Sequence, residues 1–261
     1  ILLQLMVLTF VIHLIDTLSY SVRLNSVKSG QFALSISLFN LFVLVSRTAN
    51  MFQAPLVGWI IGESLLAKVD PIQDIRMVIL ASTVGTLVGI LLIPTFLKVF
   101  EVAVKRLETT GSVPLLVVEA LHISNVKRII KKATRPKKTM IGRLRYREIP
   151  KRLLIINALV TGIYTVGVLA ASYSALLVAE EFRIAAASSS GMIHGLATIL
   201  LTLFIDPKSA VITDQAMRGD RPYEDVKALV ILLISSKLIG TMIGQALFLP
   251  AAKIIASFYG G

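Results

Sequence analysis

The sequence predicts an all-α integral membrane protein of about six transmembrane helices, arranged as two inverted three-helix repeats joined by a basic cytoplasmic linker. Of the 261 residues, 55% are hydrophobic and only 16% are charged, whereas a soluble domain carries about 25% charged residues. Six apolar runs approach the length that crosses a bilayer, and two stretches of the chain resemble each other at a nearly constant offset. This composition excludes a water-soluble enzyme and a disordered tail.

Each apolar run is expected to form a helix, because backbone N–H and C=O groups cannot stay unpaired in hydrocarbon. A seventh run, residues 51–62, contains Pro55. At about 1.5 Å per residue it extends about 18 Å, too short for a hydrocarbon core of about 30 Å. We expect it to be a re-entrant or an interfacial segment. The six predicted spans are residues 1–20, 32–45, 77–97, 153–179, 184–205 and 228–252.

The net charge of +12 is concentrated in one segment, because residues 101–152 hold 14 Lys and Arg against 4 Asp and Glu. A nucleic-acid partner is therefore not expected. Excess Lys and Arg mark the cytoplasmic side, which places this linker in the cytoplasm and both termini outside. Within the linker an apolar stretch precedes four cations, Lys127, Arg128, Lys131 and Lys132. This pattern indicates either an amphipathic helix on anionic inner-leaflet lipids or a topology signal alone.

An internal repeat relates residues 71–89 (PIQDIRMVILASTVGTLVG) to residues 222–244 (PYEDVKALVILLISSKLIGTMIG). Several identities at one offset are harder to dismiss than a single glycine motif, and the glycine pairs suit close helix packing. The matched positions are Pro71 and Pro222, Asp74 and Asp225, Arg76 and Lys227, Gly85 and Gly240, Thr86 and Thr241, and Gly89 and Gly244.

Because each copy has three spans, the second copy must lie upside down relative to the first. Inverted repeats are the usual architecture of secondary transporters, with the binding site near the midplane where the halves meet. The alternative is a duplication retained only for packing. We therefore predict a first repeat at residues 1–100, a linker at 101–152 and a second repeat at 153–261.

Polar side chains inside the first span form one helix face that includes His13, Asp16 and Arg23. A carboxylate at this depth is costly unless it is paired or hydrated, so Asp16 is a functional candidate. With His13 it could take up a proton in one facing state. The alternative is a structural charge pair between Asp16 and a cation, with Arg23 and Arg47 as the expected partners.

The other polar groups of the spans suggest an anionic cargo. Cations on a path through the membrane suit an anion, and the planar fork of arginine suits phosphate. Lys237 lies deep in the last span, although its long stem could also reach the interface. His194 is expected to form an interhelical hydrogen bond rather than a proton relay. The predicted cargo-binding residues are Arg47, Lys237, Arg23, Asn40, Asn50 and Gln53.

Several chemistries have no motif in this sequence. The chain has no cysteine, no G-x-x-x-x-G-K-[ST] loop, no H-E-x-x-H and no G-x-S-x-G. We therefore expect no cofactor, no metal and no enzymatic activity. Transport without an ATP site would run on a gradient of the cargo, of protons or of membrane potential.

Three segments carry a resemblance to a known family: HLIDTLSYSVR (13–23), SLFNLFVLVSRTANMFQAPL (37–56) and GMIHGLATILLTLFIDP (191–207). They resemble the Amj family of lipid II flippases, the alternates to MurJ, and the similarity extends over essentially the whole chain. The resemblance implies export of the lipid-linked peptidoglycan precursor from the inner to the outer leaflet of a bacterial cytoplasmic membrane.

Two other functions stay open at this point. One is a transporter of undecaprenyl phosphate in lipid carrier recycling, and the other is a non-transport scaffold for cell-wall enzymes. The expected partner is lipid II or a related undecaprenyl lipid, and a homo-oligomer is left open.

Overall fold

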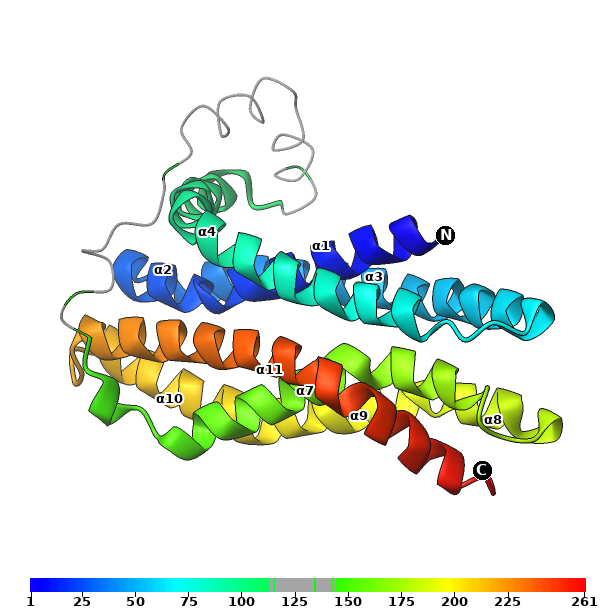
Figure 1. The fold of residues 1–261 in the computed structure, drawn as a ribbon. Coiled ribbons are helices and arrows are strands. Elements are labelled where there is room, and N and C mark those ends of the chain that lie inside the picture. Colours follow the sequence, from blue (N-terminus) through cyan, green and yellow to red (C-terminus); the bar gives the residue numbers. More distant parts are fainter. Residues whose placement is uncertain (113–114, 116–133, 135–141, 143) are drawn as a thin grey trace.

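The computed structural model describes residues 1–112, 115, 134, 142 and 144–261, and within these residues the chain is helical and contains no strand (Figure 1). The amphipathic helix expected between residues 113 and 132 lies outside the described part, apart from Leu115. In chain order the helices are α1 (Leu2–Tyr20), α2 (Val22–Ser29), α3 (Phe32–Ala67), α4 (Ile72–Thr110), η2 (Tyr146–Glu148), α7 (Lys151–Ser174), η3 (Glu180–Phe182), α8 (Arg183–Ser188), α9 (Ser190–Leu200), the π-helical segment η4 (Leu201–Ile205), α10 (Asp206–Met217) and α11 (Tyr223–Ser257).

The predicted number of spans is confirmed for the described part of the chain, where six helical stretches are long and apolar enough to cross a membrane. They run alongside one another, with both termini toward one end of the bundle (Figure 1). The end of α4 and the start of α7, which flank the linker, lie toward the opposite end. The six stretches are Leu2–Ser29, Phe32–Ala67, Ile72–Thr110, Lys151–Ser174, Glu180–Met217 and Tyr223–Ser257.

Helix α3 corrects the prediction that residues 51–62 form a short segment of their own, because they belong to one continuous helix with residues 32–50. The helix continues through Pro55 to Ala67 without a break. A proline inside a helix removes one backbone hydrogen bond, and neighbouring helices in a membrane bundle can compensate for that loss. The 36 residues of α3 extend about 54 Å, so the predicted span 32–45 is only the first part of a much longer helix.

The two copies of the sequence repeat begin equivalent helices. Pro71 immediately precedes α4 and Pro222 immediately precedes α11. Asp74 and Asp225 lie in the first turns of these helices, where a carboxylate interacts favourably with the helix dipole. At its other end α4 stops at Gly111, whose φ of 64° is a left-handed conformation that glycine adopts without strain.

The glycine pairs lie at close helix crossings, as predicted. A side chain at Gly85 on α4 would collide with the backbone oxygen of Phe10 on α1, and one at Gly89 would lie 2.8 Å from Thr17 Cβ. In the second half, a side chain at Gly240 on α11 would collide with the backbone oxygen of Ala158 on α7. In both halves the third helix therefore approaches the first at backbone distance.

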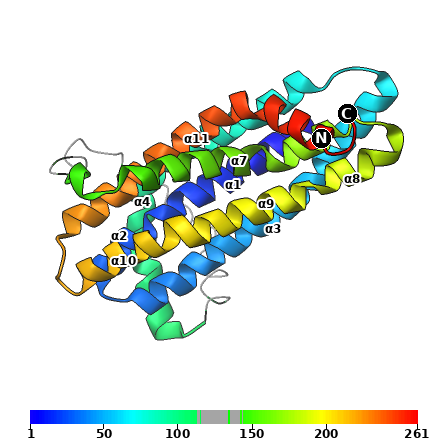
Figure 2. The ribbon, with the colours of Figure 1, turned by 90° about the horizontal axis from the view of Figure 1, so that it is seen from below.

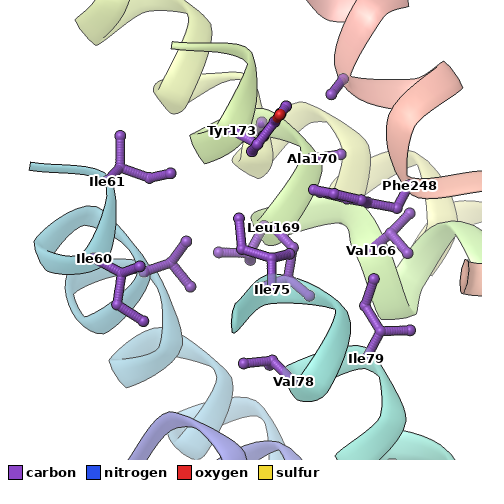
Figure 3. Packing of buried hydrophobic residues seen from close by; sticks show 14 of the residues in the cluster. Ile60, Ile61, Ile75, Val78, Ile79, Val166, Leu169, Ala170, Tyr173 and Phe248 are labelled. Carbon is purple, nitrogen blue, oxygen red and sulfur yellow. The ribbon is translucent and has the colours of Figure 1, made fainter. Parts of the chain in front are cut away.

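An apolar core joins the two halves. Ile75, Val78 and Ile79 of α4 pack with residues of α7 such as Leu169, and with Phe248 of α11 (Figure 3). Two polar contacts reinforce this junction. The hydroxyl of Tyr173 donates to the Asp70 carboxylate, 3.0 Å from Oδ1, and Gln245 Nε2 donates to the backbone oxygen of Arg76 at 2.9 Å.

Candidate functional site

A cavity of about 860 Å³ lies between α3 and the α9–η4 segment, with residues of α1, α7 and α11 completing its wall. Figure 2 shows α3 and α9 running beside each other along the same face of the bundle. Helix α3 belongs to the first half and α9 to the second, so this cavity lies where the halves meet. Its polar lining consists of His13, Asp16, Ser19, Tyr20, Arg23, Asn40, Ser46, Arg47, Asn50, Thr161, Tyr164, Ser190, His194, Thr198, Thr202, Asp206 and Lys237.

The α9 side of the cavity is a stripe of polar residues spaced four apart. In a regular α-helix, each step of four residues drifts about 40° around the axis, so such a stripe would leave the cavity after a few steps. Segment η4 prevents this, because a π-helix holds more residues per turn than an α-helix. The stripe consists of Ser190, His194, Thr198, Thr202 and Asp206.

Most of the predicted site residues line this cavity. Gln53 does not: its Nε2 donates to Thr9 Oγ1 at 2.9 Å, and the buried side chain joins α3 to α1. Gln53, about one turn beyond Asn50, thus stabilises the packing of two helices and does not line the cavity. The seven predicted residues that line the cavity are His13, Asp16, Arg23, Asn40, Arg47, Asn50 and Lys237.

Asp16 joins three helices at the wall of the cavity. It accepts a hydrogen bond of 2.6 Å from Ser46 Oγ on α3 and lies 3.8 Å from Lys237 Nζ on α11. Lys237 also donates to the backbone oxygen of His13 at 3.4 Å. The structural charge pair therefore involves Lys237, and the partners expected from the sequence, Arg23 and Arg47, were wrong.

Lys237 does not extend toward a membrane interface. Its side chain is only 4% exposed and ends beside Asp16, 5.9 Å from the centre of the Tyr20 ring. The neighbouring His13 is buried, and its Nδ1 has no hydrogen-bond partner among the described residues. An aspartate, a histidine and a lysine thus share a small region of α1 and α11.

A second polar cluster bridges α3 to the other half. Asn50 Nδ2 donates to the Tyr164 hydroxyl at 2.9 Å and lies 3.1 Å from His194 Nδ1. The Tyr164 and His194 rings stack with centroids 4.6 Å apart. His194 packs against Gly167, where a Cβ would lie 2.6 Å from the imidazole Cδ2. The predicted interhelical role of His194 agrees with this geometry.

Arg23 and Asp206 form a third contact between the halves. Arg23 Nη2 lies 3.4 Å from Asp206 Oδ1, and the guanidinium carbon lies 5.9 Å from the centre of the Tyr20 ring. The Tyr20 hydroxyl donates to Asn157 Oδ1 at 3.0 Å. Asp206, Tyr164 and Ser46 were not among the predicted site residues.

Arg47 is the remaining cation of the cavity. It is exposed at the cavity side of α3, one helical turn before Asn50, and has no ion pair among the described residues. Lys237 and Arg23 each face a carboxylate, so the charged side chains of the lining leave one positive charge uncompensated. Arginine binds phosphate oxygens through two parallel donors. The cavity is thus suited to an anion held beside Arg47.

Comparison with known proteins places this geometry in context. A family model described as "Amj: Alternate to MurJ" matches residues 8–259. The protein named "Lipid II flippase Amj" from Bacillus subtilis (strain 168) is 39% identical over 249 residues, which cover 94% of this chain and 91% of that protein. No solved structure shows significant similarity.

Proposed function

The chain belongs to the Amj family, and from this membership we infer that it is a lipid II flippase, a multi-pass protein of the bacterial cytoplasmic membrane. The observation that indicates which residues bind the cargo is the cavity between the halves, where the charge of Arg47 is uncompensated. Lipid II carries a pyrophosphate, and a planar guanidinium suits phosphate oxygens. The chain transports its cargo rather than cleaving it.

The proposed headgroup site consists of Arg47 with the amides of Asn40 and Asn50. These three residues line the cavity from one side of α3. The Asn40 amide supplies hydrogen-bond donors for phosphate or sugar oxygens, and Arg47 supplies the charge. The Nδ2 of Asn50 is bound to Tyr164 and lies beside His194, so this residue offers the cargo its amide oxygen as an acceptor. Lys237 contributes to the local potential, although its ammonium is engaged by Asp16. Gln53 is not part of this site, because its amide is bound to Thr9.

We further propose that the halves, residues 1–100 and 153–255, are inverted repeats that exchange conformations in alternating access. Three observations support this. The matched prolines begin α4 and α11, the matched glycines lie against the first helix of each half, and the cavity lies between the second helices. Transport from the inner to the outer leaflet would then follow from closing one end of the cavity and opening the other.

The orientation is a separate proposal. The linker, residues 101–152, carries most of the net charge. Its described ends, at the end of α4 and the start of α7, lie toward the end of the bundle opposite to both termini (Figure 1). By the positive-inside rule this end is cytoplasmic and both termini are extracytoplasmic. The linker cations would then meet the anionic lipids of the inner leaflet.

Transport of undecaprenyl phosphate in carrier recycling is the second candidate. It is favoured by the charge of the cavity, because a single uncompensated cation also suits a monophosphate. A scaffold for cell-wall enzymes is less well supported, since scaffolding requires neither a polar cavity nor charges inside the spans.

Reconstitution in liposomes distinguishes these candidates. Lipid II and undecaprenyl phosphate would be placed in one leaflet in parallel, and their appearance in the other leaflet followed over time. A lipid II flippase accelerates the first lipid more than the second. The reverse order would support carrier recycling, and movement of neither lipid would support the scaffold. The Arg218→Ala variant is a matched control, because Arg218 is 61% exposed at the end of α10, outside the cavity lining.

A further inference from the structure

We propose that Asp206 competes with the cargo for Arg23, so that its carboxylate occupies the guanidinium at one end of the cavity until a diphosphate headgroup replaces it. This inference rests on the proposed function and adds to it a positioning residue that the sequence had not indicated. It concerns the exchange of one anion for another on a fixed arginine.

The contact lies across the boundary between the halves. Arg23 is on α2 of the first half and Asp206 is the first residue of α10 in the second half. Both residues line the cavity, and the views from two directions place α2 and α10 toward the linker end of the bundle (Figures 1 and 2). The contact of Arg23 with Asp206 therefore joins the two halves at the linker end of the cavity.

The two partners differ in exposure, and this difference decides which one leaves. The side chain of Arg23 is 18% exposed, whereas that of Asp206 is 56% exposed. A largely buried guanidinium without a counter-ion is unfavourable, because few water molecules replace the lost interaction. The Asp206 carboxylate can be hydrated where it is. The arginine thus needs an anion, while the aspartate does not need the arginine.

Arg23 is held in place without Asp206. The Tyr20 ring lies beside its guanidinium, and the Tyr20 hydroxyl is bound to Asn157. Asn157 in turn donates to Ser236 Oγ at 2.7 Å and to the Leu233 backbone oxygen at 3.0 Å. This chain of buried contacts fixes the ring, so the arginine fork stays in the cavity wall when the carboxylate departs.

Asp206 is held less firmly. Among the described residues its carboxylate forms one ion pair, through Oδ1 at 3.4 Å, and the residue follows directly after η4. Exposed single-contact ion pairs contribute little to stability, and π-helical segments are frequent at functional positions. A diphosphate presents several charged oxygens to the same fork and forms the stronger charge-assisted pair. The exchange therefore favours the cargo.

The test is binding of farnesyl diphosphate, a soluble isoprenoid diphosphate, to the purified full chain. Removing the resident carboxylate in Asp206→Asn should tighten binding roughly threefold to fivefold. Arg23→Gln should weaken binding, and the double variant should bind like Arg23→Gln alone, because Asp206 acts only through Arg23. Asp214→Asn is the control: Asp214 is an exposed aspartate of the same helix, paired with Arg218 and outside the cavity lining.

Unchanged or weaker binding by Asp206→Asn would overturn the proposal, and so would a parent protein that binds no farnesyl diphosphate. Tighter binding by the double variant than by Arg23→Gln would also overturn it, because Asp206 would then act through general repulsion. Asp206→Ser supplies the same comparison if the asparagine variant does not fold. A parent that shows the predicted binding but moves no lipid II in liposomes would refute the proposed function and leave this contact intact.

Discussion

The ammonium of Lys237 lies 3.8 Å from the carboxylate of Asp16, although the two residues belong to opposite halves of the chain and are 221 positions apart. Ser46 from a third helix donates to the same carboxylate. Asp16 is 27% exposed toward the cavity, whereas Lys237 is 4% exposed. The buried ammonium of Lys237 therefore depends on the Asp16 carboxylate more than the carboxylate depends on the ammonium.

The first prediction follows from this asymmetry. Asp16→Leu leaves a buried ammonium without its counter-ion and should lower the free energy of unfolding by about 3 kcal/mol. Lys237→Met should cost less, because cavity water can hydrate the remaining carboxylate. The double variant should recover part of the loss. Thermal unfolding of the detergent-purified protein checks this order, and equal losses for the two single variants would contradict it.

The second prediction concerns coupling to protons. Asp16→Asn preserves the shape of the side chain and its acceptor for Ser46, but the amide cannot titrate. If Asp16 couples transport to protons, the variant should lose the response of lipid accumulation to an imposed pH gradient and keep downhill exchange. A variant that follows the pH gradient as the parent does would show that Asp16 is only the structural partner of Lys237.

Arg47 provides the third prediction. Arg47→Ala should abolish complementation of a flippase-deficient strain at normal membrane abundance, because the cavity loses its uncompensated charge. Arg47→Lys should rescue in part, since an ammonium keeps the charge but not the bidentate fork. Growth complementation with quantified protein levels measures both variants. Full activity of the alanine variant would exclude this residue from the headgroup site.

The fourth prediction concerns the helix crossings. Gly85→Ala places a methyl group against the backbone oxygen of Phe10, which cannot move aside as a side chain would. We expect a loss of about 1–3 kcal/mol in the free energy of unfolding. Gly58→Ala is the matched control, because apart from the nearby backbone of its own helix no described atom lies within 4 Å of the added Cβ. There the substitution should be neutral or stabilising, since alanine favours a helix more than glycine does. Similar losses at both positions would refute the close crossing.

Much of the fold follows from features that the sequence displays locally. Apolar length and backbone pairing predict the six helices, and the matched glycines predict their close crossings because backbone contact excludes side chains. The continuation of α3 through Pro55 is different. Whether a carbonyl freed by proline is tolerated depends on the surrounding helices, and the local sequence contains no information about them.

In the candidate site too, the local sequence predicts some features and tertiary packing determines others. Most of the predicted site residues lie on the polar faces of α1 and α3 and do line the cavity, because these faces obey the helical period. The partner of Asp16 depends on tertiary packing between distant segments, and Gln53 turns to Thr9 for the same reason. The sequence does not indicate Asp206, because the stripe that runs from α9 through η4 to this residue follows a period of four, which a regular α-helix does not keep on one side.

Segment η4 has a consequence for how this helix tolerates change. The wide turn at residues 201–205 sets the rotational phase of everything that follows it, so the number of residues in the segment matters more than their identity. Exchanging one apolar side chain there leaves the phase intact. Deleting a single residue would tighten the turn and rotate Asp206 out of line with His194 and Thr198. Insertions and deletions in this short stretch should therefore be far more damaging than substitutions.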